Sequence, residues 1–241
     1  MRVAVLSDIH GNYEALAAVV RDLDGQRAAA VVCLGDMVGY GPDPEKVIAL
    51  VRDSGYRCIL GNHEFALNDD RGRAWFNFLA AENNRATQKL LSAQSLRFCR
   101  TLPAFLEFAG AHFVHGFPKD NVFRYLHRQD DETLVKLFDR LPLRLVFVGH
   151  THRLQLVGVR PPAVARKGLA EGITALGQDS KYIVNCGSVG QPRDNDNRAK
   201  YIVWDSDDAT VEVRCVTYDF KRTMEKIRGL GFPDIYALRL A

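Results

Sequence analysis

Near its N-terminus the chain reads VAVLSDIHGN, residues 3–12. An apolar run followed at once by polar residues and a glycine is typical of a buried strand that ends in a loop. Between Leu16 and Leu23, apolar residues recur at helical spacing, which predicts an amphipathic helix. A second apolar run follows at residues 31–34. The order strand, helix, strand predicts an α/β fold.

Short apolar runs of the same kind recur and predict further strands. They lie at residues 58–60, 112–114, 145–148, 182–184 and 201–204. Residues 105–108 and 111–114 flank Gly110 as in a hairpin. Residues 211–215 alternate between apolar and polar side chains, as in a strand with one wet face. We therefore expect mixed sheets inside and helices outside.

Two further helices are predicted from capping signals and apolar spacing. One begins after an Asp43 cap, with Pro44 in its first turn, and the other spans residues 130–141. Residues 158–181 contain Pro161-Pro162 and four glycines and give no clear pattern.

Residues 65–104 interrupt the alternation of strands and helices. This stretch is rich in Asn, Arg, Gln and Ala, has helix-like segments near residues 75–84 and 92–100, and ends at Pro103. We expect a cap-like helical insertion in one domain that spans residues 1–241, because no repeat, linker or charge block divides the chain. Trp75, Phe76 and Phe78 in the insertion could form an interface in a homo-oligomer or pack inward.

Composition excludes several classes of protein. Hydrophobic residues make up 47% of the 241 residues and charged residues 25%, which is typical of a globular chain and not of a disordered or fibrous one. The net charge of +3 is too small for a nucleic-acid-binding surface. Five widely spaced cysteines without a C-x-x-C pair predict a reducing cytoplasm. The short apolar runs exclude a secretory signal and a membrane span.

Polar residues follow the predicted strands in five short blocks. The blocks are Asp8-Ile9-His10, Gly35-Asp36-Met37-Val38-Gly39, Gly61-Asn62-His63-Glu64, His115-Gly116 and Gly149-His150-Thr151-His152. Ligands of open α/β sheets gather beyond the carboxyl ends of strands, so these blocks can converge on one site. In extended chain, residues two apart point the same way with backbones about 7 Å apart. Asp8/His10 and His150/His152 could therefore each present two ligands together, although a loop with the same spacing need not do so.

The blocks contain seven candidate metal ligands. They are Asp8, His10, Asp36, Asn62, His115, His150 and His152. Imidazole and carboxylate groups without a thiolate suit divalent Mn, Fe, Zn, Co or Ni rather than calcium or a structural zinc site. Seven ligands exceed the three or four of a single site and fit two ions about 3.5 to 4 Å apart that share a carboxylate.

Each block has an ordinary structural explanation when it is taken alone. A strand-end aspartate is often a helix cap, and Gly-Asp or Gly-Asn pairs are common in turns. Five blocks together use five of the seven histidines in the chain, which favours a metal site. His112 and His127 lie outside the blocks, and we expect them to be structural or exposed.

In their order and spacing, the blocks resemble those of the calcineurin-like metallophosphoesterase superfamily. Tyr40-Gly41-Pro42 and the GSVGQPR segment at residues 187–193 resemble its small bacterial and archaeal phosphodiesterase-type branch. The resemblance implies a four-layer α-β-β-α sandwich with two mixed sheets and a site along one edge. Glu64, Phe117 and Cys186 depart from the commonest forms of this branch, but none of them removes a ligand. Phe117 and Cys186 could alter the pocket wall, which puts the substrate preference in doubt.

The resemblance also implies a role for each site residue. Asp8, His10, Asp36 and His152 would hold one ion, and Asp36, Asn62, His115 and His150 would hold the other. His63 would stay unligated and face the substrate, where it would stabilise developing charge or protonate the departing oxygen. Arg193 could contact a substrate phosphate or merely pair with Asp194 or Asp196.

These roles lead to one preferred function and several alternatives. We expect a metal-dependent phosphoesterase that uses a hydroxide activated by two metal ions to hydrolyse phosphodiesters or nucleotide polyphosphates, with a small-molecule substrate and no membrane partner. The nearest alternative is a phosphomonoesterase or protein phosphatase. A non-catalytic metal-binding scaffold is a second class, which the complete ligand set argues against. A nuclease is a third, which the small net charge argues against.

Overall fold

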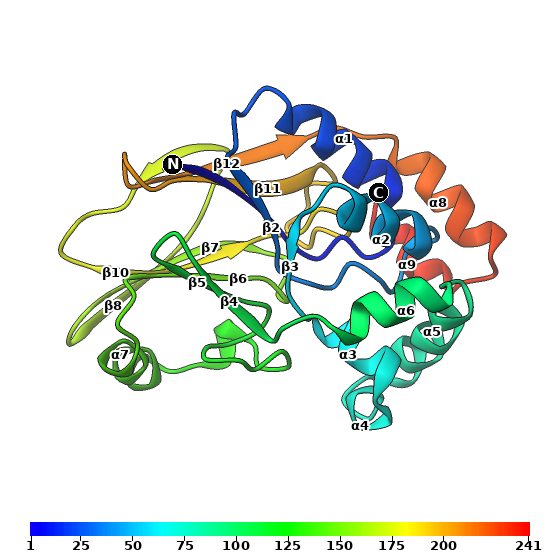
Figure 1. Ribbon diagram of the computed structural model, residues 1–241, viewed down its shortest axis with the longest axis horizontal. Helices are drawn as coiled ribbons and strands as arrows, with labels where there is room; N and C mark the ends of the chain where they lie inside the picture. The colour runs from blue at the N-terminus through cyan, green and yellow to red at the C-terminus, as the bar shows by residue number, and fades with distance from the viewer.

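Two six-stranded sheets pack face to face in the computed structural model, which describes all 241 residues (Figure 1). The first sheet has the order β3-β2-β1-β11-β12-β9. Its strands are β1 (Arg2–Leu6), β2 (Ala30–Cys33), β3 (Arg57–Cys58), β9 (Gly172–Ala175), β11 (Ala199–Asp205) and β12 (Thr210–Val216). Strands β1 to β3 pair in parallel and the others antiparallel, so the sheet is mixed as predicted.

The second sheet has the order β4-β5-β6-β10-β7-β8. Its strands are β4 (Phe105–Phe108), β5 (Ala111–Val114), β6 (Leu145–Val148), β7 (Leu154–Arg160), β8 (Ala163–Gly168) and β10 (Lys181–Cys186). The predicted hairpin is the β4–β5 pair. The stretch 158–181, which gave no sequence pattern, holds β8, β9 and the end of β7. The side chains of β8 are mostly exposed, so this strand lacks the alternation that a buried face imposes.

Helices cover the outer face of each sheet, and the predicted four-layer sandwich is confirmed (Figure 1). Helix α1 (Tyr13–Leu23) and helix α2 (Pro44–Asp53) lie on the first sheet, and α7 (Asp131–Arg140) lies on the second. Asp43 precedes α2 as predicted, but its carboxylate makes no capping hydrogen bond. Asp43 is thus the N-cap residue that was predicted, but its carboxylate pairs with Lys46 and Lys226.

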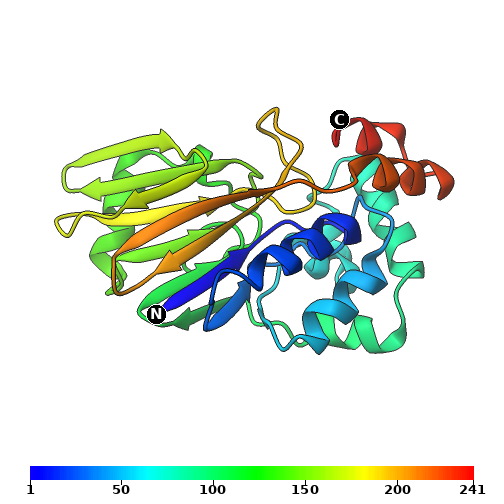
Figure 2. The same cartoon turned by 90° about the horizontal axis from the view of Figure 1, so that it is seen from above.

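Residues 62–100 form four helices at one end of the sheets (Figure 2). They are α3 (Asn62–Asn68), α4 (Asp70–Arg73), α5 (Phe78–Lys89) and α6 (Ala93–Arg100). Helix α5 begins at Phe78 and not near residue 75, because the Asn77 side chain accepts a hydrogen bond from the Ala80 amide. That these helices cap a single domain remains our interpretation.

Two short helices near the C-terminus have no counterpart in the sequence prediction. Helix α8 (Phe220–Gly229) packs beside α1, and helix α9 (Asp234–Leu238) packs beside α8. The 3-10 turn η1 (Leu126–Arg128) lies elsewhere, between β5 and α7. None of the helices combines the length and apolar character needed to span a bilayer.

The space between the sheets is filled by large apolar side chains. Phe147 on β6 stacks on Phe113 of β5 with ring centroids 5.1 Å apart, and its ring lies 5.4 Å from that of Trp204 on β11. Val3 and Val5 of β1 face this core, whereas Ala4 and Leu6 face the helices. Strand β1 is therefore buried on both faces, which explains its unbroken apolar sequence.

Loss of the Phe147 ring should destabilise the sandwich. Phe147→Ala is expected to lower the free energy of unfolding by about 3 to 5 kcal/mol, because the cavity between the sheets cannot collapse fully. Urea unfolding followed by circular dichroism measures the change. Phe78→Ala is the matched control, since that ring is 77% exposed, and it should change stability by less than about 0.5 kcal/mol. Equal effects of the two substitutions would contradict this account of the core.

Candidate metal centre

The loops that follow the strands meet at one edge of the sandwich and bring all seven predicted ligands together. Asp8 and His10 follow β1, Asp36 follows β2, and Asn62 begins α3 after β3. The remaining three ligands come from the second sheet: His115 follows β5, and His150 and His152 follow β6. All seven are buried, with at most 6% of any residue exposed.

One cluster joins Asp8, His10 and His152. The Nε2 atoms of His10 and His152 lie 3.2 Å apart, and Oδ1 of Asp8 lies 3.2 Å from His152 Nε2 and 3.7 Å from His10 Nε2. Three potential ligand atoms therefore surround one point, in a geometry that could hold a metal ion.

A second cluster joins Asp36, Asn62, His115 and His150. Nε2 of His115 lies 3.3 Å from Asp36 Oδ2, 3.0 Å from Asn62 Oδ1 and 3.2 Å from His150 Nδ1. The same Asp36 oxygen lies 3.8 Å from His10 Nε2, so Asp36 stands between the two clusters. The neighbouring ligands His150 and His152 thus belong to different clusters.

The backbone of the ligand loops is left-handed, not extended. Five ligands have positive φ: Asp8 (54°), His10 (50°), Asp36 (50°), His150 (66°) and His152 (59°). Non-glycine residues seldom adopt this conformation, and it tends to cluster at functional sites. The backbone of both pairs is therefore not extended. Asp8 and His10 nevertheless present their side chains to one cluster, whereas the joint presentation expected for His150 and His152 is wrong.

Backbone carbonyls determine which nitrogen of three histidines faces the clusters. Nδ1 of His10 donates to Val38 O at 3.0 Å, and Nδ1 of His152 donates to Gln191 O at 2.6 Å. His115 Nδ1 donates to Leu34 O at 2.9 Å in the same way. Each Nε2 is thereby presented to its cluster, which is the arrangement that orients histidine ligands in metal sites.

This arrangement leaves electron pairs facing one another in the first cluster. With both Nδ1 atoms donating to carbonyls, Nε2 of His10 and Nε2 of His152 are acceptors only 3.2 Å apart. Oδ1 of Asp8 is buried beside them and has no hydrogen-bond partner. Unsatisfied buried acceptors are costly, and a cation would satisfy all three at once. The residues present therefore fit a divalent metal ion.

The electrostatics of the second cluster lead to the same conclusion. Burial alone would raise the pKa of Asp36, but the adjacent histidines, His115 first, hold it well below its usual value. Burial would lower the pKa of His115, but Asp36 and Asp8 outweigh it and raise the pKa to about 9. Burial lowers the pKa of His150 to about 4. The buried carboxylates thus retain one positive charge nearby, which a metal ion could also supply.

His63 lies at the wall of the site beside Asp36. Its Nδ1 atom is buried without a hydrogen-bond partner, and burial lowers the pKa of the ring to about 3. The ring packs against His10 and Phe76, with centroids 4.9 and 4.7 Å away. Gly39 makes room for it, since a Cβ at Gly39 (φ +88°) would lie 2.1 Å from His63 Nδ1.

Glu64 supports the site in a way that the sequence analysis did not recognise. Its carboxylate accepts hydrogen bonds from the backbone amides of Asp36 (2.8 Å), Val38 (3.1 Å) and Gly61 (3.0 Å). Burial, and then the charge of Asp36, raises the pKa of Glu64 to about 7. The signal available in the sequence was an acidic residue three positions after Gly61, where it can bond back to the helix N-terminus.

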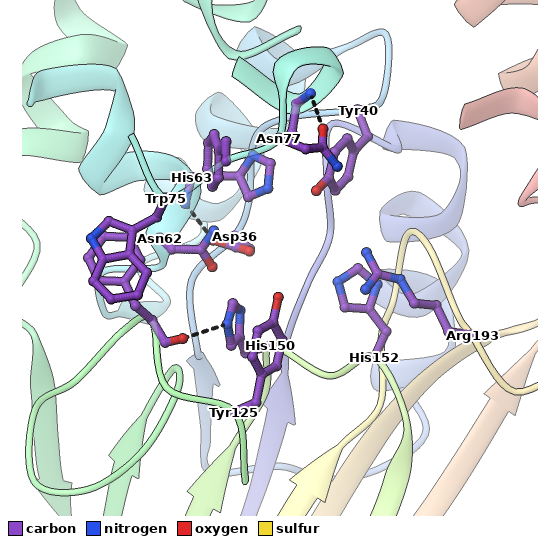
Figure 3. A pocket seen from close by; sticks show the side chains of 13 residues that line it. Asp36, Tyr40, Asn62, His63, Trp75, Asn77, Tyr125, His150, His152 and Arg193 are labelled. Carbon is purple, nitrogen blue, oxygen red and sulfur yellow. Dashed lines mark hydrogen bonds between the residues drawn. The ribbon is translucent and has the colours of Figure 1, made fainter. Parts of the chain in front are cut away.

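A pocket of about 170 Å³ opens onto the second cluster and His63 (Figure 3). Arg193, from the loop after β10, lies on one side of it beside His152, and Trp75 lies on the opposite side. Arg193 makes no ion pair with Asp194 or Asp196, which bind Lys200 and Arg198 instead. Its buried Nε has no partner.

Several pocket residues were missed as site residues, among them three aromatics of its wall. Tyr125 stacks on His150 with centroids 3.9 Å apart, and Phe123 accepts a hydrogen bond from His150 Nε2 through its carbonyl oxygen at 3.3 Å. Trp75 stacks on the Phe123 ring at 5.3 Å. No local motif marks these aromatics: Trp75 lies between α4 and α5, and Phe123 and Tyr125 lie on the loop after β5. His112 is buried on β5 against Lys119 O, and His127 is exposed, both away from the clusters.

The fold and the paired histidine–carboxylate clusters define a metal-binding α/β protein, and the comparisons identify its class. The chain belongs to the calcineurin-like phosphoesterase family of phosphoester hydrolases, whose model matches residues 1–154. It is 35% identical to an uncharacterized protein of Methanocaldococcus jannaschii over 99% of this chain and 96% of that protein. The predicted family is confirmed.

Two further similarities extend the comparison. A crystal structure of a metallophosphoesterase from Sphaerobacter thermophilus superposes with a TM-score of 0.84 at 31% identity, covering 100% of this chain and 98% of that one. Serine/threonine-protein phosphatase 1 of Salmonella typhimurium is 32% identical over 126 residues, which are 47% of this chain and 56% of that protein.

The charge on His115 should make the stability of metal-stripped protein depend on pH. A pKa raised from 6.5 to about 9 stabilises the fold fully below pH 6.5, and this stabilisation is lost as pH rises to about 9. The loss is on the order of 3 kcal/mol. Urea unfolding of the stripped protein between pH 6.5 and 9.5, compared with His115→Asn, measures it. The variant should show a flatter profile, and identical profiles would contradict the assignment.

Proposed function

We propose that this protein hydrolyses phosphodiester or nucleotide-polyphosphate bonds at a centre of two divalent metal ions. The observation that carries the proposal is the pair of ligand clusters that share Asp36. Its Oδ2 is 3.8 Å from the Nε2 of His10 and 3.3 Å from that of His115. A shared carboxylate between two cation positions is the usual arrangement of two-metal phosphoesterases.

We assign the ligands according to these clusters. Asp8, His10 and His152 would hold one ion, and Asn62, His115 and His150 the other, with Asp36 bridging. The nitrogen and oxygen donors suit Mn, Fe, Zn, Co or Ni. When bound, the two ions would supply an activated water molecule near neutral pH and neutralise the phosphoryl oxygens.

His63 is proposed as the catalytic residue of the chain itself. Because burial lowers its pKa to about 3, the ring is neutral at neutral pH and can donate one hydrogen bond. This favours stabilisation of charge on the departing oxygen over transfer of a proton from a charged imidazole. The hydrogen bond from Asn84 Nδ2 to the His63 carbonyl (3.1 Å) holds the start of α3 in place.

The pocket walls support a substrate with a phosphate and a planar group. Arg193 is proposed to bind a phosphate oxygen, since its buried Nε has no partner. Trp75 is 71% exposed yet stacked on Phe123, so one face of an ordered aromatic pair is open beside the pocket. A nucleobase or aryl ring stacks well on such a surface. This favours nucleotides and other aryl-bearing esters.

A phosphomonoesterase is the second candidate, because the Salmonella phosphatase matches 47% of this chain. The complete set of buried donors argues against a non-catalytic scaffold. We propose a cytoplasmic location, in keeping with five free cysteines. Assays of purified protein with each proposed metal and with aryl diesters, cyclic nucleotides, dinucleotide polyphosphates and monoesters test the function. Monoester preference would favour the second candidate, and absence of both bound metal and turnover would favour a scaffold.

Metal content should follow the two clusters. We expect about two ions per wild-type chain, about one in His152→Ala or His150→Ala, and fewer still in Asp36→Ala, because Asp36 serves both positions. Elemental analysis of purified, folded protein gives the stoichiometry. His127→Ala is the matched control, since that histidine is exposed and outside both clusters, and it should keep two ions. A single ion in wild-type protein would refute the binuclear assignment.

Removal of the His63 ring should separate catalysis from metal binding. His63→Ala is expected to retain its metal and to lose about 10²- to 10³-fold in kcat, as for loss of a hydrogen-bond donor to a developing negative charge. Steady-state kinetics on an aryl diester and elemental analysis of the same sample provide the two readouts. Unchanged turnover would eliminate the role, and loss of metal would show that His63 is a ligand, which its place beside His10 and Asp36 permits.

A further inference from the structure

A second cavity, of about 500 Å³, adjoins the pocket at the histidine clusters. Tyr125 and Arg193 line both, so the two cavities are neighbours. The second cavity also receives Arg128, which follows the site aromatics on the chain, and Arg153, which directly follows His152. Three segments that are distant in the sequence thus bring three arginines to one place.

The charged side chains that line this cavity are all arginines. No carboxylate lines it, and none of its three arginines forms an ion pair. Other arginines of the surface, such as Arg166 and Arg198, are paired with acidic side chains. The pKa of His127, also in the lining, is lowered by burial and then by the charges of Arg128 and Arg153. Like charges that converge without a counter-charge destabilise the protein unless an anion joins them.

Two of the arginines lie next to residues of the site. The Arg128 guanidinium lies 5.3 Å from the centre of the Tyr125 ring, which stacks on the ring of His150 and also contacts that of His127. Arg153 directly precedes β7, and its backbone amide donates to Thr151 Oγ1 at 3.3 Å. An anion held here would therefore lie beside a phosphate at the clusters.

The volume of the pocket at the clusters limits how much of a nucleotide substrate it can hold. The pocket at the clusters, about 170 Å³, accommodates a phosphate group but not a nucleotide, whose sites usually exceed about 300 Å³. The remainder of the substrate must lie on the Trp75 and Phe123 surface or in the arginine cavity. These two places are on opposite sides of the clusters, since Trp75 and Arg193 face each other across the pocket (Figure 3).

We propose that the cavity lined by Arg128, Arg153 and Arg193 binds a second phosphate of a nucleoside polyphosphate substrate. This rests on the proposed phosphoesterase function and narrows it from phosphodiesters in general to substrates with consecutive phosphates. One phosphate lies at the clusters, the next lies among the arginines, and the base lies on the Trp75 and Phe123 surface. Guanidinium groups suit this task because they bind phosphate through paired, charged hydrogen bonds.

The first test measures binding without turnover. Isothermal titration of metal-loaded protein, at fixed free metal, compares AMP with adenosine 5′-(α,β-methylene)diphosphate. We expect the diphosphate analogue to bind at least about 10-fold more tightly than AMP, and the double variant Arg128→Ala/Arg153→Ala to abolish most of this preference. Arg160→Ala is the matched control, because Arg160 is exposed and unpaired at the far end of β7, about 20 Å away. It should keep the wild-type preference.

The second test compares substrates. The ratio of kcat/KM for a dinucleoside polyphosphate to that for bis-p-nitrophenyl phosphate should fall at least about 10-fold in the double variant and stay unchanged in Arg160→Ala. Arginine-dependent binding of the analogue without any turnover would overturn the phosphoesterase and support the phosphate site. Equal affinity for the two nucleotides in wild-type protein, or no effect of the double variant, would overturn the phosphate site whatever the turnover. Tighter arginine-dependent binding of a 5′-phosphorylated oligonucleotide would overturn the nucleotide assignment in favour of nucleic acid.

Discussion

Buried acceptor atoms that face one another are the constraint on which the site depends. Asp8 Oδ1 and the Nε2 atoms of His10 and His152 meet at one point. Both histidines donate their Nδ1 protons to the carbonyls of Val38 and Gln191, so neither Nε2 carries a proton that could bridge these acceptors. Such an arrangement is unfavourable in a protein interior unless a cation is present. The fold therefore supplies a site with a strong preference for positive charge, and the chemistry of the family follows from that preference.

Hydrogen bonds around the ligands stabilise this otherwise unfavourable geometry. Ligand loops in the left-handed conformation are held by contacts beyond the ligands, such as the Glu64 carboxylate that joins the Asp36 loop to the start of α3. Ser7 donates a hydrogen bond to Asp8 Oδ2 at 2.6 Å, which leaves Oδ1 to the cluster. Both contacts lie on rigid strand ends, because the apolar core between the sheets fixes the strands themselves.

The substrate side of the site is built differently from the metal side. The ligand loops come from strand ends of both sheets, whereas the aromatic surface comes from the helices at residues 62–100 and the loop after β5. The arginines belong to separate loops again. The ligands and the walls can therefore vary independently, and under our proposal selectivity depends on wall residues such as Trp75 and Arg153, which carry no recognisable motif.

Much of the fold and the ligand set could be predicted from the sequence alone. Strands buried on both faces have unbroken apolar sequences, and the five polar blocks lie at their ends, so β-α-β order, family and candidate ligands follow from local patterns. The strand β8 was not predicted, because its mostly exposed side chains lack the alternation that a buried face imposes. The C-terminal helices α8 and α9 were not predicted either, because they pack mainly against each other and α1, and local spacing does not reveal those neighbours.

The sequence by itself thus determined which donor atoms the chain carries and in what order. The tertiary structure decided how they are grouped: His150 and His152, two residues apart, turn to different clusters. Asp8 and His10 have the same spacing and the same left-handed backbone, yet they share one cluster, so neither feature alone fixes the grouping. The tertiary structure also decided that Arg128, Arg153 and Arg193 share one cavity. Grouping of this kind depends on how two sheets pack, and residue spacing along the chain does not encode the distance between them.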